Sequence, residues 1–123
     1  MRAFTTKRFH IWATKEGLTE AVLAEAIEEI TQGLIGDSLG GNVYKKRIKM
    51  PGRGKRGGAR TLIAYKAREK VFFTFGFAKN ERENIDTNEL KAIKKFAEEL
   101  LAYTEKQLKH SIENGAVREI KKG

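Results

Sequence analysis

Several residue types are missing or scarce in this sequence of 123 residues, and each shortage excludes a class of function. Cysteine is absent, which excludes disulfide bonds, thiolate nucleophiles and cysteine-based zinc sites. No cluster of His, Asp and Glu has the spacing of metal ligands, so we expect no metal and no cofactor. Hydrophobic runs are only a few residues long, which predicts no membrane-spanning helix. These features predict a soluble protein of the reducing cytoplasm, without a membrane partner.

Acidic residues are in the minority. The chain has 25 Lys and Arg against 16 Asp and Glu, which gives a formal net charge of +9. Such an excess indicates an anionic partner, and nucleic acid ranks ahead of an anionic membrane surface. The length, with 40% hydrophobic residues and no internal repeat or linker, predicts one domain with a single core.

The first third of the chain has the pattern of a strand followed by two helices. Phe4 marks the short strand, and Thr5 or Thr6 can cap the helix after it. A second helix is predicted after Thr19, with apolar residues at three- and four-residue intervals. The glycines and polar residues at 36–41 predict a loop.

Three strands are predicted in the middle of the chain, at residues 43–50, 60–66 and 71–78. Alternation in the first separates an apolar face from a basic face: Tyr44, Ile48 and Met50 against Lys45, Arg47 and Lys49. Lys46 interrupts the apolar face. The tyrosines of these strands, Tyr44 and Tyr65, are expected in the core because of the parity of their positions.

The third of these strands carries an alternating apolar stripe, which consists of Val71, Phe73, Phe75 and Phe77. We expect this stripe to be the contribution of the sheet to the core. Gly76 and Ala78 are expected on the opposite face, where their small size leaves room for a ligand.

Two helix starts are recognisable in the last third of the chain. Asp86 and Glu89 have the spacing of a capping box, and an amphipathic helix follows as far as Leu101. Thr104 and Gln107 repeat the capping signal, which predicts a shorter helix and then a last short strand or a frayed tail.

The strongest local signal lies between Ser38 and Arg68, where there are ten basic residues and no acidic one. Lysines that protect an exposed strand from aggregation are an alternative explanation, but that role needs only a few charges. Like charges on one strand face repel, and a bound polyanion offsets that cost. The glycine-rich run at 51–58 predicts a hairpin loop that contacts phosphates. It does not match a nucleotide-binding P-loop, because no Ser or Thr and no helix follow its lysine.

Three segments together resemble the RelE/ParE toxin superfamily, particularly its HigB-like branch. They are Gly40–Arg47, Pro51–Arg60 and Phe75–Arg82. The resemblance covers residues 2 to about 101 and implies an α+β, RelE-like fold. In that fold an N-terminal strand and two helices precede a three-stranded antiparallel sheet core and a C-terminal helix. Residues 1–101 are then the toxin domain, and residues 102–123 are a helical extension of the same domain.

The resemblance also implies an activity. The family's toxins belong to type II toxin–antitoxin systems, and the implied activity is metal-independent endoribonuclease cleavage of messenger RNA on the ribosome, which blocks translation. The implied partners are the ribosome, messenger RNA and a cognate helix-turn-helix antitoxin. In this chemistry a ribose 2′-hydroxyl attacks the adjacent phosphate, and fixed cations stabilise the extra negative charge that develops. The positions that match the family's site are Lys45, Arg47, Lys49, Arg60, Lys79, Asn80 and Glu81.

Roles for these residues follow from their chemistry. Arg47 and Arg60 are expected to hold the scissile phosphate, since a guanidinium binds two phosphate oxygens at once. Lys49 or Lys45 is the candidate proton acceptor, because crowding among cations disfavours its charged form. Glu81 orients that base or forms a surface salt bridge. Further contacts to RNA are expected from Lys46, Arg53, Lys55 and Arg56.

Two departures from the RelE pattern leave the general acid unassigned: Asn80 stands where an arginine is expected, and the tyrosine expected after it is absent. Two other functions therefore remain open. One is a ParE-like poison of DNA gyrase, and the other is a non-catalytic RNA-binding module.

Overall fold

The computed structural model describes residues 1–50, 58–78 and 85–121. Within these residues the chain forms an α+β arrangement of helices and strands. In chain order they are β1 (Arg2–Thr6), α1 (Lys7–Glu16), α2 (Glu20–Thr31), β2 (Asp37–Gly40), β3 (Val43–Ile48), β4 (Ala59–Lys66), β5 (Lys70–Ala78), α3 (Thr87–Leu101), α4 (Glu105–Glu113) and β6 (Val117–Ile120).

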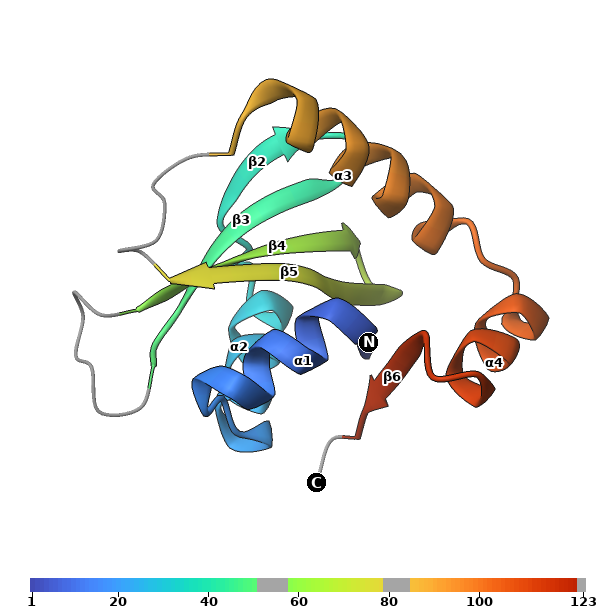
Figure 1. Ribbon diagram of the computed structural model, residues 1–123, viewed down its shortest axis with the longest axis horizontal. Coiled ribbons are helices and arrows are strands. Elements are labelled where there is room, and N and C mark those ends of the chain that lie inside the picture. Colours follow the sequence, from blue (N-terminus) through green and yellow to red (C-terminus); the bar gives the residue numbers. More distant parts are fainter. Residues whose placement is uncertain (51–57, 79–84, 122–123) are drawn as a thin grey trace.

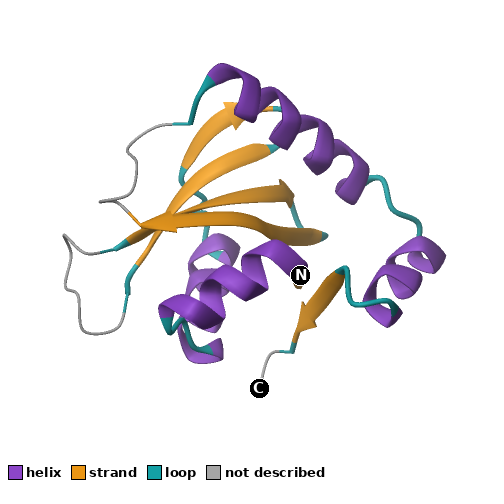
Figure 2. Cartoon of the chain, viewed as in Figure 1, coloured by secondary structure: helices purple, strands orange, loops and turns teal. Residues whose placement is uncertain are grey.

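The described strands form one mixed sheet in the order β2-β3-β4-β5-β1-β6. Only β1 and β5 pair in parallel, and the other neighbours are antiparallel. Helices α1 and α2 lie on one face of this sheet and α3 lies across the other (Figures 1 and 2). Both faces of the central strands are therefore buried, and an apolar core lies on each side.

The helices begin where the sequence predicts them to begin. A threonine or aspartate side chain accepts a hydrogen bond from the backbone N–H three residues later at the start of each described helix: Thr6, Thr19, Asp86 and Thr104. At α4 the capping box is complete, because the Gln107 side chain also accepts from the Thr104 N–H. These caps satisfy first-turn donors that have no partner within the helix.

The sheet is larger than the three-stranded core that the sequence predicts. Residues Asp37–Gly40, expected in a loop, form the edge strand β2 against β3. The tail of the chain forms β6, which pairs with β1. The loop expectation was wrong because Asp37 and Gly40 have low strand propensity, whereas pairing at a sheet edge depends on backbone hydrogen bonds. Gly40, Gly41 and Asn42 have positive φ and make the tight turn into β3.

Strand β5 contains a β-bulge that changes the predicted core stripe. Leu62 pairs with Phe75 and Ile63 pairs with Phe73, so Thr74 is the extra residue on β5. The Thr74 hydroxyl donates to the Leu62 carbonyl at 2.6 Å, and the Thr6 hydroxyl donates to the Thr74 carbonyl at 2.7 Å. One extra residue reverses the alternation of the strand beyond it.

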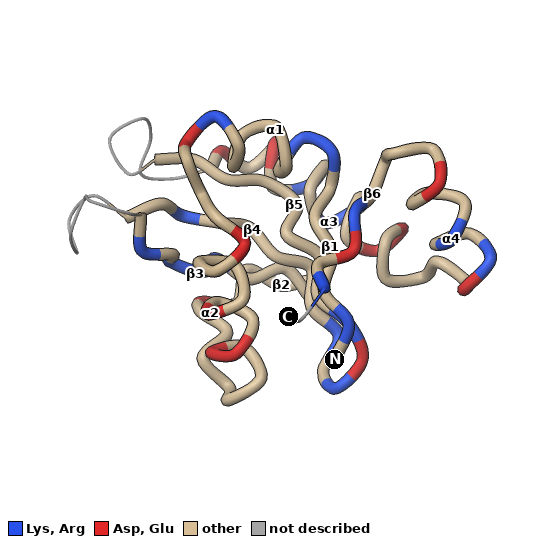
Figure 3. Tube along the Cα trace, turned by 90° about the horizontal axis from the view of Figure 1, so that it is seen from below, with Lys and Arg blue, Asp and Glu red and all other residues tan. Residues whose placement is uncertain are grey.

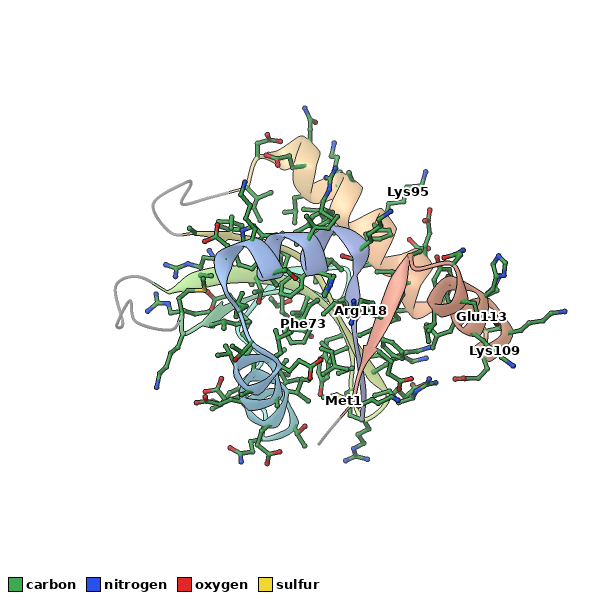
Figure 4. All side chains as sticks on the ribbon, turned by 60° about the horizontal axis from the view of Figure 1, so that its bottom comes forward. Met1, Phe73, Lys95, Lys109, Glu113 and Arg118 are labelled. Carbon is green, nitrogen blue, oxygen red and sulfur yellow. The ribbon has the colours of Figure 1, made fainter. Side chains whose placement is uncertain are left out.

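The bulge divides the four residues of the predicted stripe between the two faces. Val71 and Phe73 pack with α1 and α2, whereas Phe75 and Phe77 pack on the side of α3. Figure 4 shows Phe73 in the interior beneath α1. The single-face stripe was therefore wrong, and β5 contributes large side chains to both cores.

The last helix and strand are fastened to the N-terminal strand by one arginine. The Arg2 guanidinium donates two hydrogen bonds to the Glu119 carboxylate on β6, at 2.9 and 3.0 Å. It also donates to Glu105 at the start of α4, at 2.9 and 3.1 Å. The hydrogen bonds from Arg2 hold the pKa of Glu119 below its ordinary value. We call these three residues the Arg2 clamp.

Candidate nucleic-acid interface

Three basic side chains share the sheet face that α3 partly covers, and a fourth, Lys49, directly follows β3. Lys45 and Arg47 have the parity of Val43, whose side chain packs into the core beneath α3. Arg60 on β4 has the parity of Leu62, which packs into the same core. We call Lys45, Arg47, Lys49 and Arg60 the basic face. Figure 3 shows the basic positions of β3 gathered at the end of the sheet away from α4.

Pairing across the strands explains why the basic face begins where the core ends. The row Val43, Ala64 and Phe72 is apolar and buried. The next row on the same face contains Lys45, Leu62 and Phe75. The row after that contains Arg47, Arg60 and Phe77. Along this face, basic residues therefore replace apolar ones on β3 in the second row, and on β3 and β4 in the third.

Arg47 and Arg60 are direct cross-strand partners. Residues in this relation have Cβ atoms about 4.5–5.5 Å apart, and two like charges at such positions destabilise the sheet. Among the described residues, neither arginine has a hydrogen bond or salt bridge to a carboxylate. A phosphate between them removes the repulsion and accepts hydrogen bonds from both forks.

Acidic residues of α2 approach the outer edge of β3 but do not neutralise the basic face. A cavity of about 220 Å³ is lined by Glu25 and Glu29 together with Arg47 and Lys49. The ion pair at this edge is formed by Lys46, whose Nζ lies 3.1 Å from Glu29 Oε1.

Lys46 is not available to RNA in this structure, which corrects its inclusion among the expected RNA contacts. It is 5% exposed and lies on the face opposite the basic face. Its Nζ donates to the Leu34 carbonyl at 2.9 Å as well as to Glu29. Lys46 therefore joins α2 and the segment after it to the sheet, and its charge is already compensated.

Gly76 and Ala78 do not make room for a ligand on the basic face. The Thr74 bulge places Gly76 on the opposite face, beneath Trp12 of α1. A Cβ at Gly76 would overlap the indole ring, so glycine is required here for the close approach of a helix. The two tyrosines expected in the core, Tyr44 and Tyr65, are half-buried and pack against it, with ring centroids 5.9 Å apart.

Several expected site residues lie outside the described residues. They are Lys79, Asn80 and Glu81 after β5, and Arg53, Lys55 and Arg56 in the predicted hairpin loop. Of the other four residues of the expected site, the structure places Lys45, Arg47 and Arg60 on one face, and Lys49 directly after β3.

The structure also adds three residues that sequence reasoning missed. A groove of about 320 Å³ lies between β5 and the start of α3, and Phe75, Phe77 and Arg8 contribute to its lining. The Arg8 guanidinium lies over the Phe75 ring, 5.7 Å from its centroid. No sequence signal locates this groove, because the bulge and the packing of α1 bring its residues together.

Within the described part of the chain, no group of three or more His, Cys, Asp or Glu residues is placed to hold a metal ion. In the same residues, no helix has the length and apolar character needed to cross a membrane.

Comparison of the sequence with models of known protein families assigns the chain to a family. A family model for the RelE toxin of the RelE/RelB toxin–antitoxin system matches residues 1–120. The chain belongs to the RelE toxin family. No curated protein matches the sequence. RelE membership assigns the chain a toxin role and implies an antitoxin partner.

The RelE match extends further than the resemblance seen in the sequence, which ended at about residue 101. It includes α4 and reaches the end of β6. The tail is therefore inside the family match, in agreement with the pairing of β6 with β1 in the same sheet.

Proposed function

We propose that this protein is a ribosome-dependent endoribonuclease that cleaves messenger RNA and blocks translation. The observation that carries the proposal is the Arg47–Arg60 pair, which is not buried and has no carboxylate partner among the described residues. A protein that folds for stability alone has no use for two adjacent unpaired guanidiniums, because their repulsion costs free energy. Membership in the RelE toxin family supports the same conclusion.

The basic face supplies the groups that phosphodiester cleavage needs. Arg60 and Arg47 bind the non-bridging oxygens of the scissile phosphate and stabilise the charge that develops as the 2′-oxygen attacks. Lys49 or Lys45 is the general base that takes the proton of the 2′-hydroxyl. The P–O5′ bond breaks and the 5′-oxygen leaves with a proton, which gives a 2′,3′-cyclic phosphate and a 5′-hydroxyl end. Lys79, Asn80 and Glu81 stay candidates for the remaining contacts, including delivery of that proton.

The proposal includes the partners and the setting. Arg53, Lys55 and Arg56 contact phosphates of the message or the ribosome, and the run Gly54–Arg60 favours the HigB-like branch of the family. Activity takes place in the cytoplasm, where ribosomes are. A cognate helix-turn-helix antitoxin blocks it.

The deciding experiment is single-turnover cleavage of a message on purified ribosomes at saturating protein. Wild type should produce new 5′-hydroxyl ends, and Lys49→Ala should cut more slowly. Lys109→Ala is the matched control, because it removes the same charge from α4, at the far end of the molecule (Figure 4). If wild type does not cut, the nuclease proposal is wrong. Growth arrest with a DNA-damage response would then support gyrase poisoning, and binding without toxicity would support an RNA-binding module.

A further inference from the structure

A hollow of about 320 Å³ lies beside the basic face, between β5 and the first turns of α3. We call it the β5–α3 groove. Its lining is mainly apolar, with one cationic and one acidic side chain, and includes Arg8, Leu62, Phe75, Phe77, Ile93 and Glu89. The volume is at the low end of the range of roughly 300–1,000 Å³ for small-molecule sites, which suits one flat ring system better than a helix or a strand.

The groove is directly adjacent to the phosphate-binding pair. Phe77 is the cross-strand partner of Arg60, and Leu62 lies two residues from Arg60 on the same face of β4. A ligand that contacts Phe77 or Leu62 in the groove is therefore next to Arg60 on the sheet. A nucleotide has this combination of parts, since its aromatic base is joined through the ribose to a phosphate.

Phe75 is the side chain best placed to contact such a base. It is half-buried, with the Arg8 guanidinium over its ring and Phe96 at a centroid distance of 6.2 Å. Proteins commonly bind unpaired bases with an aromatic ring next to a cation. The base stacks on the ring, and the cation contacts the phosphate of the same nucleotide.

The bulge at Thr74 is what brings Phe75 to this face. Without the extra residue, Phe75 and Phe77 would share the face of Phe73 and pack against α1. The bulge is held from both sides by the hydroxyls of Thr6 and Thr74. Bulges commonly redirect a side chain next to a functional site.

We propose that the β5–α3 groove binds one unpaired RNA base, adjacent to the phosphate held by Arg47 and Arg60, with Phe75 as the stacking surface and Arg8 at its rim. The proposal rests on the proposed function, since it takes RNA as the ligand of the basic face. It adds a specificity-determining site that is separate from the cleavage chemistry.

The test measures binding and not cleavage. Short single-stranded RNAs that each carry 2-aminopurine at one position are mixed with the protein at low salt. Stacking on Phe75 should quench the fluorescence at one position of the RNA. Phe75→Leu keeps an apolar side chain in the groove but removes the ring, so the quenching should be lost and affinity should fall roughly five- to a hundred-fold.

Two controls keep the interpretation clear. Lys109→Ala should retain the quenching and the affinity. The emission of Trp12, the only tryptophan, reports on folding of the Phe75→Leu variant, because Trp12 packs on Gly76 on the other face of the sheet.

The outcomes separate this proposal from the nuclease proposal. Quenching that survives in Phe75→Leu, or RNA that binds wild type without quenching at any position, overturns the base-binding groove. Absence of RNA binding to wild type at low salt overturns it as well. If Phe75-dependent quenching is present but ribosomes carry no cleaved message, the groove stands and the nuclease proposal fails.

Discussion

Arg2 and Arg60 both lie on strands of the same sheet, and neither is buried, but their surroundings are opposite. Arg2 bonds two carboxylates and joins β1 to β6 and α4. Arg60 faces a second arginine and has no carboxylate partner among the described residues. Lys46, one residue from Arg47, is also paired, with Glu29. Arg2 and Lys46 thus stabilise the fold through carboxylate partners, whereas Arg60 has none among the described residues.

The largest expected effect concerns the core that supports both regions. Phe73 is 0% exposed and packs beneath α1, so Phe73→Ala should lower the free energy of unfolding by about 3–5 kcal/mol. Phe75→Ala should cost less than half of that, because Phe75 is half-buried. Urea unfolding of both variants checks this. Equal losses would contradict the difference in burial between Phe73 and Phe75.

The second prediction tests Arg60, the arginine without a carboxylate partner among the described residues. Arg60→Ala should lower the single-turnover cleavage rate by about 10²–10³ with a much smaller change in ribosome affinity, because the guanidinium stabilises charge of the transition state. Arg60→Lys should be intermediate, since a lysine keeps the charge without the bidentate fork. The free energy of unfolding should not fall, because repulsion from Arg47 is removed. A loss of stability with unchanged cleavage would make Arg60 a structural residue like Arg2.

The third prediction tests Arg2, which is paired with two carboxylates. Arg2→Ala should lower the free energy of unfolding by about 1 kcal/mol, since the salt bridges are partly exposed and screened by solvent. Cleavage at saturating protein should stay at the wild-type rate. Urea unfolding and the ribosome assay are measured on the same preparation. A large fall in cleavage would mean that the Arg2 clamp and the basic face are coupled.

Salt dependence separates the two kinds of cation further. Loss of one phosphate contact in Arg47→Ala should reduce the slope of log affinity against log salt by about 0.7–0.9, which is roughly a threefold difference between 50 and 200 mM salt. Arg2→Ala should leave the slope unchanged, because its charge is already satisfied by carboxylates. Binding to ribosomes or RNA over a salt series gives both slopes. Identical slopes for the two variants would contradict the assignment of Arg47 to a phosphate.

The smallest effect is a pH dependence of the Arg2 clamp. The pKa of Glu119 is lower in the folded protein than its unfolded value of about 4.3, because Arg2 donates hydrogen bonds to its charged form. Its contribution to stability is therefore complete above about pH 4.3 and is lost as the pH falls through the lower folded value. We expect a few tenths of a kcal/mol for so exposed a group. The difference in stability between wild type and Arg2→Ala should shrink between about pH 5 and pH 3, and a constant difference would contradict the mechanism.

Local signals predicted much of the fold. Thr6, Thr19, Asp86 and Thr104 mark helix starts through contacts only three residues long, and such contacts depend on neighbouring residues alone. The alternation of β3 likewise placed Lys45 and Arg47 on one face. The edge strand β2 was not predicted, and β6 was left open between a short strand and a frayed tail, because both strands depend on pairing with strands already in the sheet.

The sequence by itself determined the concentration of positive charge, the positions of the caps and the parity of β3, since each depends on residue type and short spacing. Only the tertiary structure decided which cations are free. It paired Lys46 with Glu29 across 17 residues and Arg2 with Glu119 across 117. It also placed an extra residue at Thr74, which turned Phe75 towards the basic face. Partners so distant in the chain meet only when helices and strands pack, and no local pattern specifies them.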